Sequence, residues 1–80
     1  MRLDTYINQA EAGNRKAFAR RCGVPNSTVN RIADEEVCCR IDTALAIIQA
    51  SQERPAPSGE VVTFLDLVPR RTLRRARRRA

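Results

Sequence analysis

Residues 15–35, RKAFARRCGVPNSTVNRIADE, decide how this chain folds. Asn14 precedes the segment, and because asparagine is a good helix N-cap it predicts a helix over residues 15–22. Gly23 is expected to end that helix, since glycine adopts the left-handed backbone conformation without a clash at Cβ. A second helix is predicted over residues 26–34, after a turn of three residues. Two short helices joined by such a turn, with glycine in it, are typical of a helix-turn-helix unit.

Each apolar position in this stretch has a packing role. Ala19 is small enough to let the two helices approach each other closely. Val29 and Ile32 lie three residues apart on the second helix and, together with Val24 in the turn, would hold it against its neighbours. The opposite face of the second helix carries Asn, Ser and Thr, which are weaker helix formers than Lys, Glu, Gln or Ala. That composition favours a face that contacts a ligand over a plain solvent-exposed face.

The flanking segments predict further short helices. Apolar residues with the spacing i, i+4 and i+7 predict a helix over residues 3–11. Asp42 is expected to cap a helix over residues 43–51. The residues expected on the inward face of that helix are Ile41, Ala44, Leu45 and Ile48. The chain is therefore predicted to be all-α, with four to five short helices, a helix-turn-helix and a basic C-terminal arm.

Residues 60–68, EVVTFLDLV, follow a connector rich in Pro, Gly, Ser and Glu and allow two interpretations. Their β-branched and aromatic content fits a strand, which would have to pair with its copy in a second subunit. The lack of clean alternation favours a short extension followed by a helical turn capped by Thr63. A chain this short cannot bury all its apolar residues, so residues 60–69 are predicted to form a dimerisation segment. The residues assigned to that interface are Phe64, Leu65, Leu67 and Val68.

Positive charge is concentrated at the C-terminus. The chain has 15 basic and 9 acidic residues and a formal net charge of +6. Residues 70–80, RRTLRRARRRA, hold seven of the arginines and no acid, which leaves 8 basic and 9 acidic residues in residues 1–69. This block predicts a flexible arm after residue 69, disordered by self-repulsion when free and able to become helical on phosphates. The arginines of the arm expected to contact phosphates are Arg70, Arg71, Arg74 and Arg75.

The chain lacks the residues of several function classes. It contains no histidine, the commonest general base and metal ligand, and no glycine-rich phosphate-binding motif, so we expect neither enzyme activity nor a cofactor. Cys22, Cys38 and Cys39 lack the further ligands of a zinc site and are expected to be free thiols in the cytoplasm. No apolar run approaches the ~20 residues of a membrane-spanning helix, and residues 1–11 lack the apolar stretch and cleavage site of a secretion signal, so we do not expect export. The small size argues against a separate small-molecule sensing domain.

Residues 15–35 resemble the helix-turn-helix signature of transcriptional regulators of the Cro and phage-repressor type. The matching positions are a small residue, a glycine and three aliphatic residues: Ala19, Gly23, Val24, Val29 and Ile32. The resemblance covers residues 1 to about 51 and is looser over residues 59–69. It implies a lambda-repressor-like DNA-binding fold, in which Arg15 and the adjacent Lys16 contact the phosphate backbone. The positions that it implies contact bases are Asn26, Ser27, Thr28, Asn30 and Arg31.

These residue types suit base recognition. Asparagine can form two hydrogen bonds to adenine, and arginine can do the same to guanine. Pro25 stands where a capping Ser or Thr is common, which leaves open whether Asn26 is the first base-reading residue or an N-cap. The acidic residues Asp34, Glu35 and Glu36, at the other end of this helix, would repel phosphate if they lay near the backbone.

These observations predict a cytoplasmic, sequence-specific transcriptional regulator, a repressor from a phage or mobile element. It would bind a palindromic operator as a homodimer, because two recognition helices related by a two-fold axis read successive faces of the major groove. The near-neutral body allows an alternative, a protein-binding antiactivator or anti-repressor built on a helix-turn-helix core. RNA binding through the arginine-rich arm alone is a further alternative.

Overall fold

Five α-helices and one short 3-10 turn make up the part of the chain that the computed structural model describes, residues 1–79, with side chains placed up to residue 77. In chain order they are α1 (Leu3–Ala10), α2 (Arg15–Cys22), α3 (Asn26–Ala33), α4 (Ile41–Glu53), the turn η1 (Leu65–Leu67) and α5 (Arg70–Arg79). No strand occurs among these residues. The predicted all-α class is therefore confirmed for the described part of the chain.

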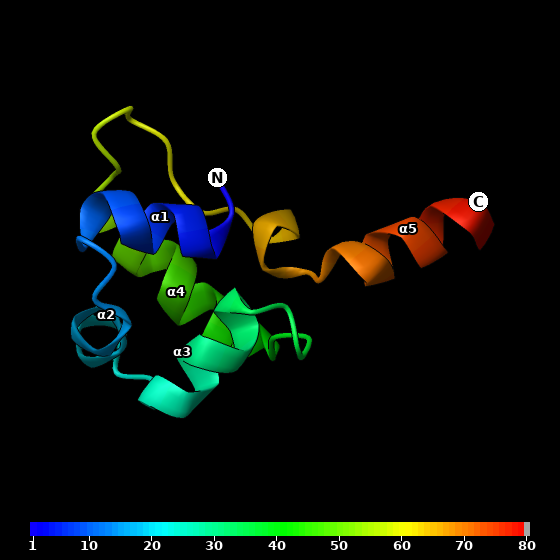
Figure 1. Ribbon diagram of the computed structural model, residues 1–80, viewed down its shortest axis with the longest axis horizontal. Helices are drawn as coiled ribbons and strands as arrows, with labels where there is room; N and C mark the ends of the chain where they lie inside the picture. The colour runs from blue at the N-terminus through cyan, green and yellow to red at the C-terminus, as the bar shows by residue number, and fades with distance from the viewer. Residues whose placement is uncertain (80) are drawn as a thin grey trace.

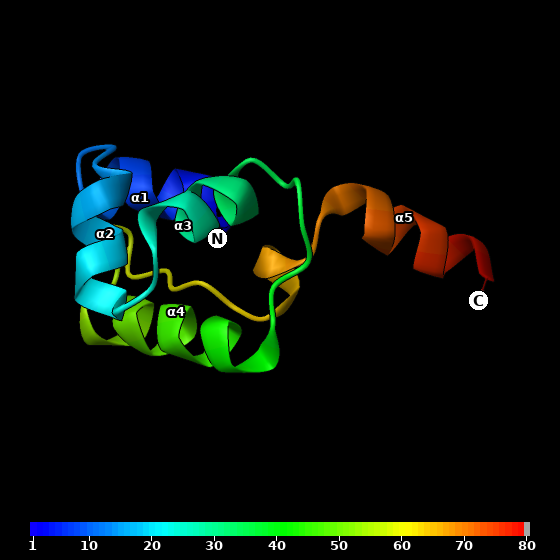
Figure 2. The same ribbon diagram turned by 90° about the horizontal axis from the view of Figure 1, so that it is seen from below.

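Helices α1 to α4 enclose one hydrophobic core. Figure 2 shows α4 along one side of the three shorter helices, and the segment after α4 returning beside it towards η1. Tyr6 and Phe18 lie at the centre, with ring centroids 5.5 Å apart in an edge-to-face arrangement. Burial of each large apolar side chain contributes ~1.5–3 kcal/mol. The largest fully buried side chains include Tyr6, Ile7, Phe18, Val29, Ile47 and Val62.

Both ends of α2 form as the sequence predicts. The Asn14 side chain accepts a hydrogen bond from the Ala17 backbone N–H at 3.0 Å and so caps the first turn. Gly23 follows the last turn with a φ of 73°, in the left-handed region. The N–H of Val24 then bonds the Ala19 carbonyl at 3.1 Å, which closes the helix end.

Helix α3 takes the earlier of its two possible starts. Asn26 is its first helical residue, and Pro25 occupies the N-cap position with a φ of −57°. Because proline has no N–H and a fixed φ, it can precede the helix without leaving a donor unpaired. Asn26 is therefore available on the surface and is not consumed as a cap. The helix ends at Ala33, one residue before the predicted end.

Helix α4 corrects the prediction for this segment. It begins at Ile41, and Asp42 lies in its first turn, where its carboxylate accepts the N–H of Thr43 at 2.9 Å. Ile41 and Leu45 are 73% and 53% exposed, so their predicted inward orientation is wrong. The inward face consists of Ala44, Ile47, Ala50 and Ser51. Both stripes have helical spacing, and the small alanines allow closer packing of α4 on its neighbours.

The segment after α4 is an extension and a turn, in agreement with the favoured interpretation. The Val62 backbone N–H donates to the buried Ser51 hydroxyl at 3.0 Å. The turn is not capped by Thr63 as predicted: the Asp66 carboxylate accepts the N–H and hydroxyl of Thr63 at 2.9 and 2.8 Å. The same carboxylate binds the N-terminal ammonium of Met1 at 2.9 Å, which ties the turn to the start of the chain.

Helix α5 leaves the body of the protein as a separate arm (Figure 1). The sequence predicts a disordered free arm over residues 70–80, whereas residues 70–79 form a helix and residue 80 lies outside the described residues. The Pro69 side chain is fully buried, and its carbonyl accepts the N–H groups of Thr72 and Leu73 at 2.9 and 3.2 Å. These bonds start the helix at a fixed point of the body. No helix within residues 1–79 is long and apolar enough to cross a membrane.

Candidate nucleic-acid interface

Helix α3 presents a polar face to solvent because its apolar face is held by the core. Val29 and Ile32 are 0% and 4% exposed. On the other side Asn26, Ser27 and Arg31 are exposed. An amide, a hydroxyl and a guanidinium are groups that can bond base edges or phosphates. Three of the five predicted base-contacting residues are therefore accessible to a partner.

The other two predicted base-contacting residues are half-buried. Thr28 lines a shallow depression with Pro25 and Asp42. The Asn30 side-chain oxygen accepts a hydrogen bond of 3.3 Å from Nη1 of Arg15. That bond leaves the Asn30 amide group free to donate, and leaves one lone pair on the oxygen. Asn30 can therefore still donate a hydrogen bond to a partner while Arg15 holds its side chain in place.

Arg15 is bound by two carboxylates. Its Nη2 lies 3.1 Å from Asp4 on α1 and 3.0 Å from Asp34 at the end of α3. The hydrogen bond that the Arg15 guanidinium donates to Asp34 raises the pKa of Arg15, although burial opposes the shift, and the bond to Asp4 adds to it. Two partner carboxylates weaken the attraction of this guanidinium for a phosphate. Lys16, its neighbour, is exposed and has no such partner among the described residues.

The predicted dimer segment divides into buried and exposed residues. Leu67 is 2% exposed within a single chain, so it packs in the core and its assignment to an interface is wrong. Val68 is half-buried. Phe64 and Leu65 are 50% and 63% exposed and remain accessible to a second copy. Leu65 and Leu67 are two residues apart in this short turn, so they point to different sides, and Leu67 is the one that enters the core.

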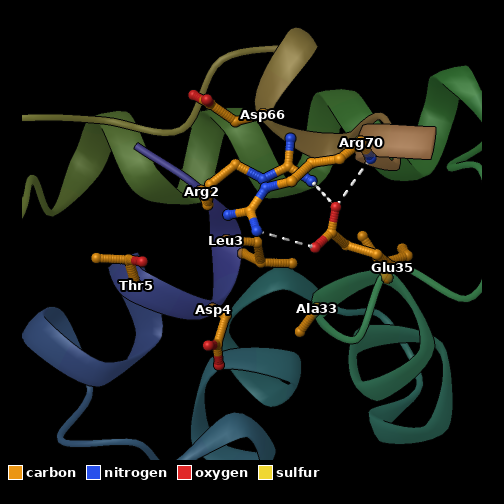
Figure 3. A pocket seen from close by; sticks show the side chains of 9 residues that line it. Arg2, Leu3, Asp4, Thr5, Ala33, Glu35, Asp66 and Arg70 are labelled. Carbon is orange, nitrogen blue, oxygen red and sulfur yellow. Dashed lines mark hydrogen bonds and ion pairs between the residues drawn. The ribbon is translucent and has the colours of Figure 1, made fainter. Parts of the chain in front are cut away.

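The arm is attached at the loop that follows α3. Figure 3 shows Arg2, Glu35 and Arg70 meeting there, with Asp66 close by. The Glu35 carboxylate accepts the Arg70 backbone N–H at 2.9 Å and contacts the Arg2 guanidinium at 2.7 Å. The Arg71 guanidinium donates to the backbone carbonyls of Glu35 and Glu36. The Arg70 guanidinium lies 3.8 Å from the Glu35 carboxylate and stays 62% exposed. Two of the four predicted phosphate-contacting residues of the arm thus contact the loop after α3.

The remaining arginines of the arm are available. Arg74, Arg75 and Arg77 are exposed, and none of them makes an ion pair with another described residue. No acid lies on α5, so nothing on the helix offsets their charge. This part of the arm therefore concentrates positive charge on the surface and is suited to phosphates.

The electrostatics of the attachment point favour a charged Glu35. The hydrogen bond from the Arg70 N–H lowers the pKa of the Glu35 carboxyl. Burial opposes the shift, and the charges of Arg2, Arg70 and Arg71 act in the same direction as the hydrogen bond. Glu35 is therefore a carboxylate at neutral pH. The sequence predicts Glu35 only as one of three acids that repel phosphate, because its partners lie more than 30 residues away in the chain.

Two of the three cysteine thiols are partly buried, and the third is exposed. Burial raises the pKa of the Cys22 thiol to about 11, and burial also raises the pKa of Cys39. Both thiols are therefore protonated at neutral pH and weakly nucleophilic. Cys38 is exposed. Within the residues that the structure describes, no group of three or more Cys, Asp or Glu side chains is arranged to hold a metal ion.

Comparison with known proteins adds no relative. No protein-family model matches the chain, and no curated protein or solved structure is detectably similar to it.

Proposed function

We propose that the chain is a sequence-specific DNA-binding transcriptional regulator of the helix-turn-helix type, acting in the cytoplasm as a repressor on a palindromic operator. Helix α3 would enter the major groove, and the arginines of α5 would contact phosphates. A second copy would bind through the exposed Phe64 and Leu65. This assignment follows from the residues and their geometry and from the resemblance of residues 15–35 to the Cro and phage-repressor type.

The observation that carries the proposal is the division of α3 into two faces. Its aliphatic side is buried against the body, and Gly23 in the left-handed conformation sets its direction after α2. Its outer side carries short polar side chains and Arg31, which have little reason to be there for helix stability alone. Such side chains reach base edges when a helix lies in the major groove.

The test is selection of duplexes from a random pool with the full chain, followed by fluorescence anisotropy with the enriched duplex and a scrambled one. Arg31→Ala should reduce the preference for the enriched duplex by ~1–3 kcal/mol, the value of one bidentate base contact. Arg40→Ala is the matched control, because Arg40 is exposed but lies in the loop before α4. Failure to enrich any sequence would refute the proposal.

A protein-binding function is the second candidate, and two observations favour it. Arg15, at the position implied to bind phosphate, is paired with Asp4 and Asp34. Large apolar side chains are also exposed on α4 and η1: Ile41, Leu45, Phe64 and Leu65. An antiactivator would retain its activity in Arg31→Ala and lose it in Leu45→Ala, which is the reverse of the pattern expected for a DNA reader.

RNA binding by the arm alone predicts a third pattern. Replacement of Arg74, Arg75 and Arg77 by glutamine in the full chain would then abolish binding to any nucleic acid, whereas Arg31→Ala would have no effect. A DNA reader that uses the arm for phosphates keeps its preferred sequence in the triple variant. Its affinity would fall less steeply with salt, because fewer counterions are released on binding.

A further inference from the structure

Glu35 acts at the N-terminus of a helix that is remote in sequence. Arg70 is the first residue of α5, and its backbone N–H is one of the donors that a helix cannot satisfy internally. The Glu35 carboxylate accepts this N–H at 2.9 Å from the loop after α3. A negative charge at this position is also favourable to the helix dipole. Glu35 thus caps α5 across 35 residues of sequence.

Further hydrogen bonds stabilise the contact between Glu35 and Arg70 on both sides. Arg2 binds Glu35 through Nη2 and bonds the carbonyl of Val68 through Nη1 at 3.0 Å, so it links the loop to the segment that leads into α5. On the other side, Nη2 of Arg71 donates to the Glu36 carbonyl at 2.9 Å. These bonds surround a small cavity of about 110 Å³ that is lined by Arg2, Glu35 and Arg70, among others. The base of α5 is therefore held by groups from three parts of the chain.

The residue type at position 35 is a second, independent observation. Helix α3 ends with the N–H of Glu35 bonded to the Ile32 carbonyl and the N–H of Glu36 bonded to the Arg31 carbonyl. This pattern requires a left-handed residue at position 35, where glycine is strongly preferred. Glu35 has a φ of 61° and is one of two such residues other than glycine among the described residues. Glutamate at this position supplies a carboxylate to the first turn of α5, which glycine could not supply.

We propose that Glu35 is a positioning residue that docks α5 onto the C-terminal end of α3, so that the arm and the polar face of α3 bind one DNA duplex together. The inference rests on the proposed function. A free arm of seven arginines repels itself and has to become ordered when it binds, whereas a docked arm is already helical and has a fixed orientation relative to α3. Pre-ordering of this kind raises the affinity without any new contact to the phosphates.

The sign of the effect separates docking from simple electrostatics. Removal of a negative charge near the interface would strengthen binding to phosphates if charge alone mattered. Docking predicts the opposite: Glu35→Gln weakens binding, because the arm is released. Glu36→Gln is the matched control, since the Glu36 side chain is exposed and the described residues form no ion pair with it.

The first measurement tests docking without nucleic acid. The Cys38 sulfur lies 3.9 Å from the Thr72 hydroxyl, so Thr72→Cys in a Cys39→Ser background places two thiols side by side when α5 is docked. A mild oxidant such as diamide, which takes up two electrons and two protons, would then join Cys38 to the introduced thiol. We expect Glu35→Gln to slow this reaction about threefold or more and Glu36→Gln to leave it unchanged. Equal rates in both variants would overturn the proposal.

The second measurement uses the enriched duplex and anisotropy. Wild-type protein and Glu36→Gln should bind alike, or Glu36→Gln slightly more tightly, whereas Glu35→Gln should bind several-fold more weakly. Glu35→Gly serves as a second variant, because glycine relieves the left-handed backbone while it removes the carboxylate. It should be stably folded by circular dichroism and bind as weakly as Glu35→Gln. Tighter binding by either variant would refute the coupling of arm and α3.

The two proposals fail in different ways. If no duplex is preferred while cross-linking still depends on Glu35, the DNA-binding function is refuted, and with it the role of docking in DNA recognition. If the duplex is preferred through Arg31 but Glu35→Gln binds as tightly as wild type, the function stands and the positioning role is refuted.

Discussion

Arg21 is expected to be the most important charged residue for stability. Its guanidinium bonds the Glu11 carboxylate at 2.9 Å, the Tyr6 hydroxyl at 2.9 Å and the Ala50 carbonyl at 2.6 Å. It also lies 5.3 Å from the centre of the Phe18 ring, which adds a cation–π contact. Burial lowers the pKa of Arg21, but the hydrogen bonds to Tyr6 and Glu11 and their charges outweigh it and raise the pKa, so the charge is favoured in the folded state. One side chain thus connects α1, α2 and α4.

Arg21→Met keeps much of the side-chain volume and removes the charge and the hydrogen bonds. It leaves the Glu11 carboxylate, which is 8% exposed, with only the exposed Arg54 at 3.6 Å. Loss of one partner of a buried ion pair costs ~3–5 kcal/mol, and the remaining arginine places the expected loss near 3 kcal/mol. A chain of this length has a total stability of ~4–12 kcal/mol, so the variant would lose a quarter or more of it.

Urea denaturation followed by far-UV circular dichroism measures this loss. Arg20→Met is the control, because Arg20 is the exposed neighbour on the same helix and should change the free energy of unfolding by less than ~0.5 kcal/mol. Addition of Glu11→Gln to Arg21→Met should restore ~1 kcal/mol or more, since it removes a buried charge that keeps only an exposed partner. A loss below ~1 kcal/mol in Arg21→Met, or further destabilisation by Glu11→Gln, would refute this reasoning.

Three further predictions concern the fold. Gly23→Ala should destabilise the chain by ~1 kcal/mol through backbone strain alone, because a Cβ there meets no atom within 4 Å. A loss of more than ~3 kcal/mol in urea unfolding would indicate a steric clash instead. Leu67 is 2% exposed and Leu65 is 63% exposed, so Leu67→Ala should cost ~2–4 kcal/mol and Leu65→Ala less than ~1 kcal/mol. Similar losses in the two variants would contradict this reasoning. Burial raises the pKa of Asp66, but hydrogen bonds from the N-terminal ammonium and Thr63 outweigh it and hold the pKa below its ordinary value. The stabilisation by the Asp66 carboxylate is therefore present at neutral pH and is lost as the pH falls through the pKa of Asp66 in the folded state. In thermal melts, the melting temperature of Asp66→Asn should thus fall less on acidification than that of the wild type.

Local signals predicted the elements that depend on neighbouring residues. The start of α2 at Arg15 follows from the Asn14 cap, and its end follows from Gly23, since both act within one turn of the helix. The buried side of α3 was predicted correctly for Val29 and Ile32. These interactions join residues that are close in sequence, so the local sequence is enough to predict them.

The facing of α4 could not be predicted in the same way. Its sequence carries two apolar stripes of helical spacing, one through Ile41 and Leu45 and the other through Ala44 and Ile47. Periodicity indicates that a helix has a buried side but does not distinguish between two stripes that both qualify. The shape of the space left by α1, α2 and the returning segment decides which stripe enters the core.

The candidate site shows the same division. Asn26, Ser27 and Arg31 were predicted as surface groups and are exposed, because the opposite face of α3 is anchored by its own aliphatic residues. The pairing of Arg15 with Asp4 and Asp34 was not predicted, because it joins three helices. No short-range pattern records a contact of that kind.

By itself, the sequence determined the all-helical class, the two short helices around Gly23, the polar outer face of α3 and the concentration of arginine after Pro69. Only the tertiary structure decided which stripe of α4 is buried, that Leu67 belongs to the core, and that Glu35 holds the first turn of α5. The physical reason is the separation in sequence over which each kind of interaction acts. Helix propensity, capping and charge density act between neighbours in the chain, whereas burial and ion pairing depend on which distant segments the fold brings together.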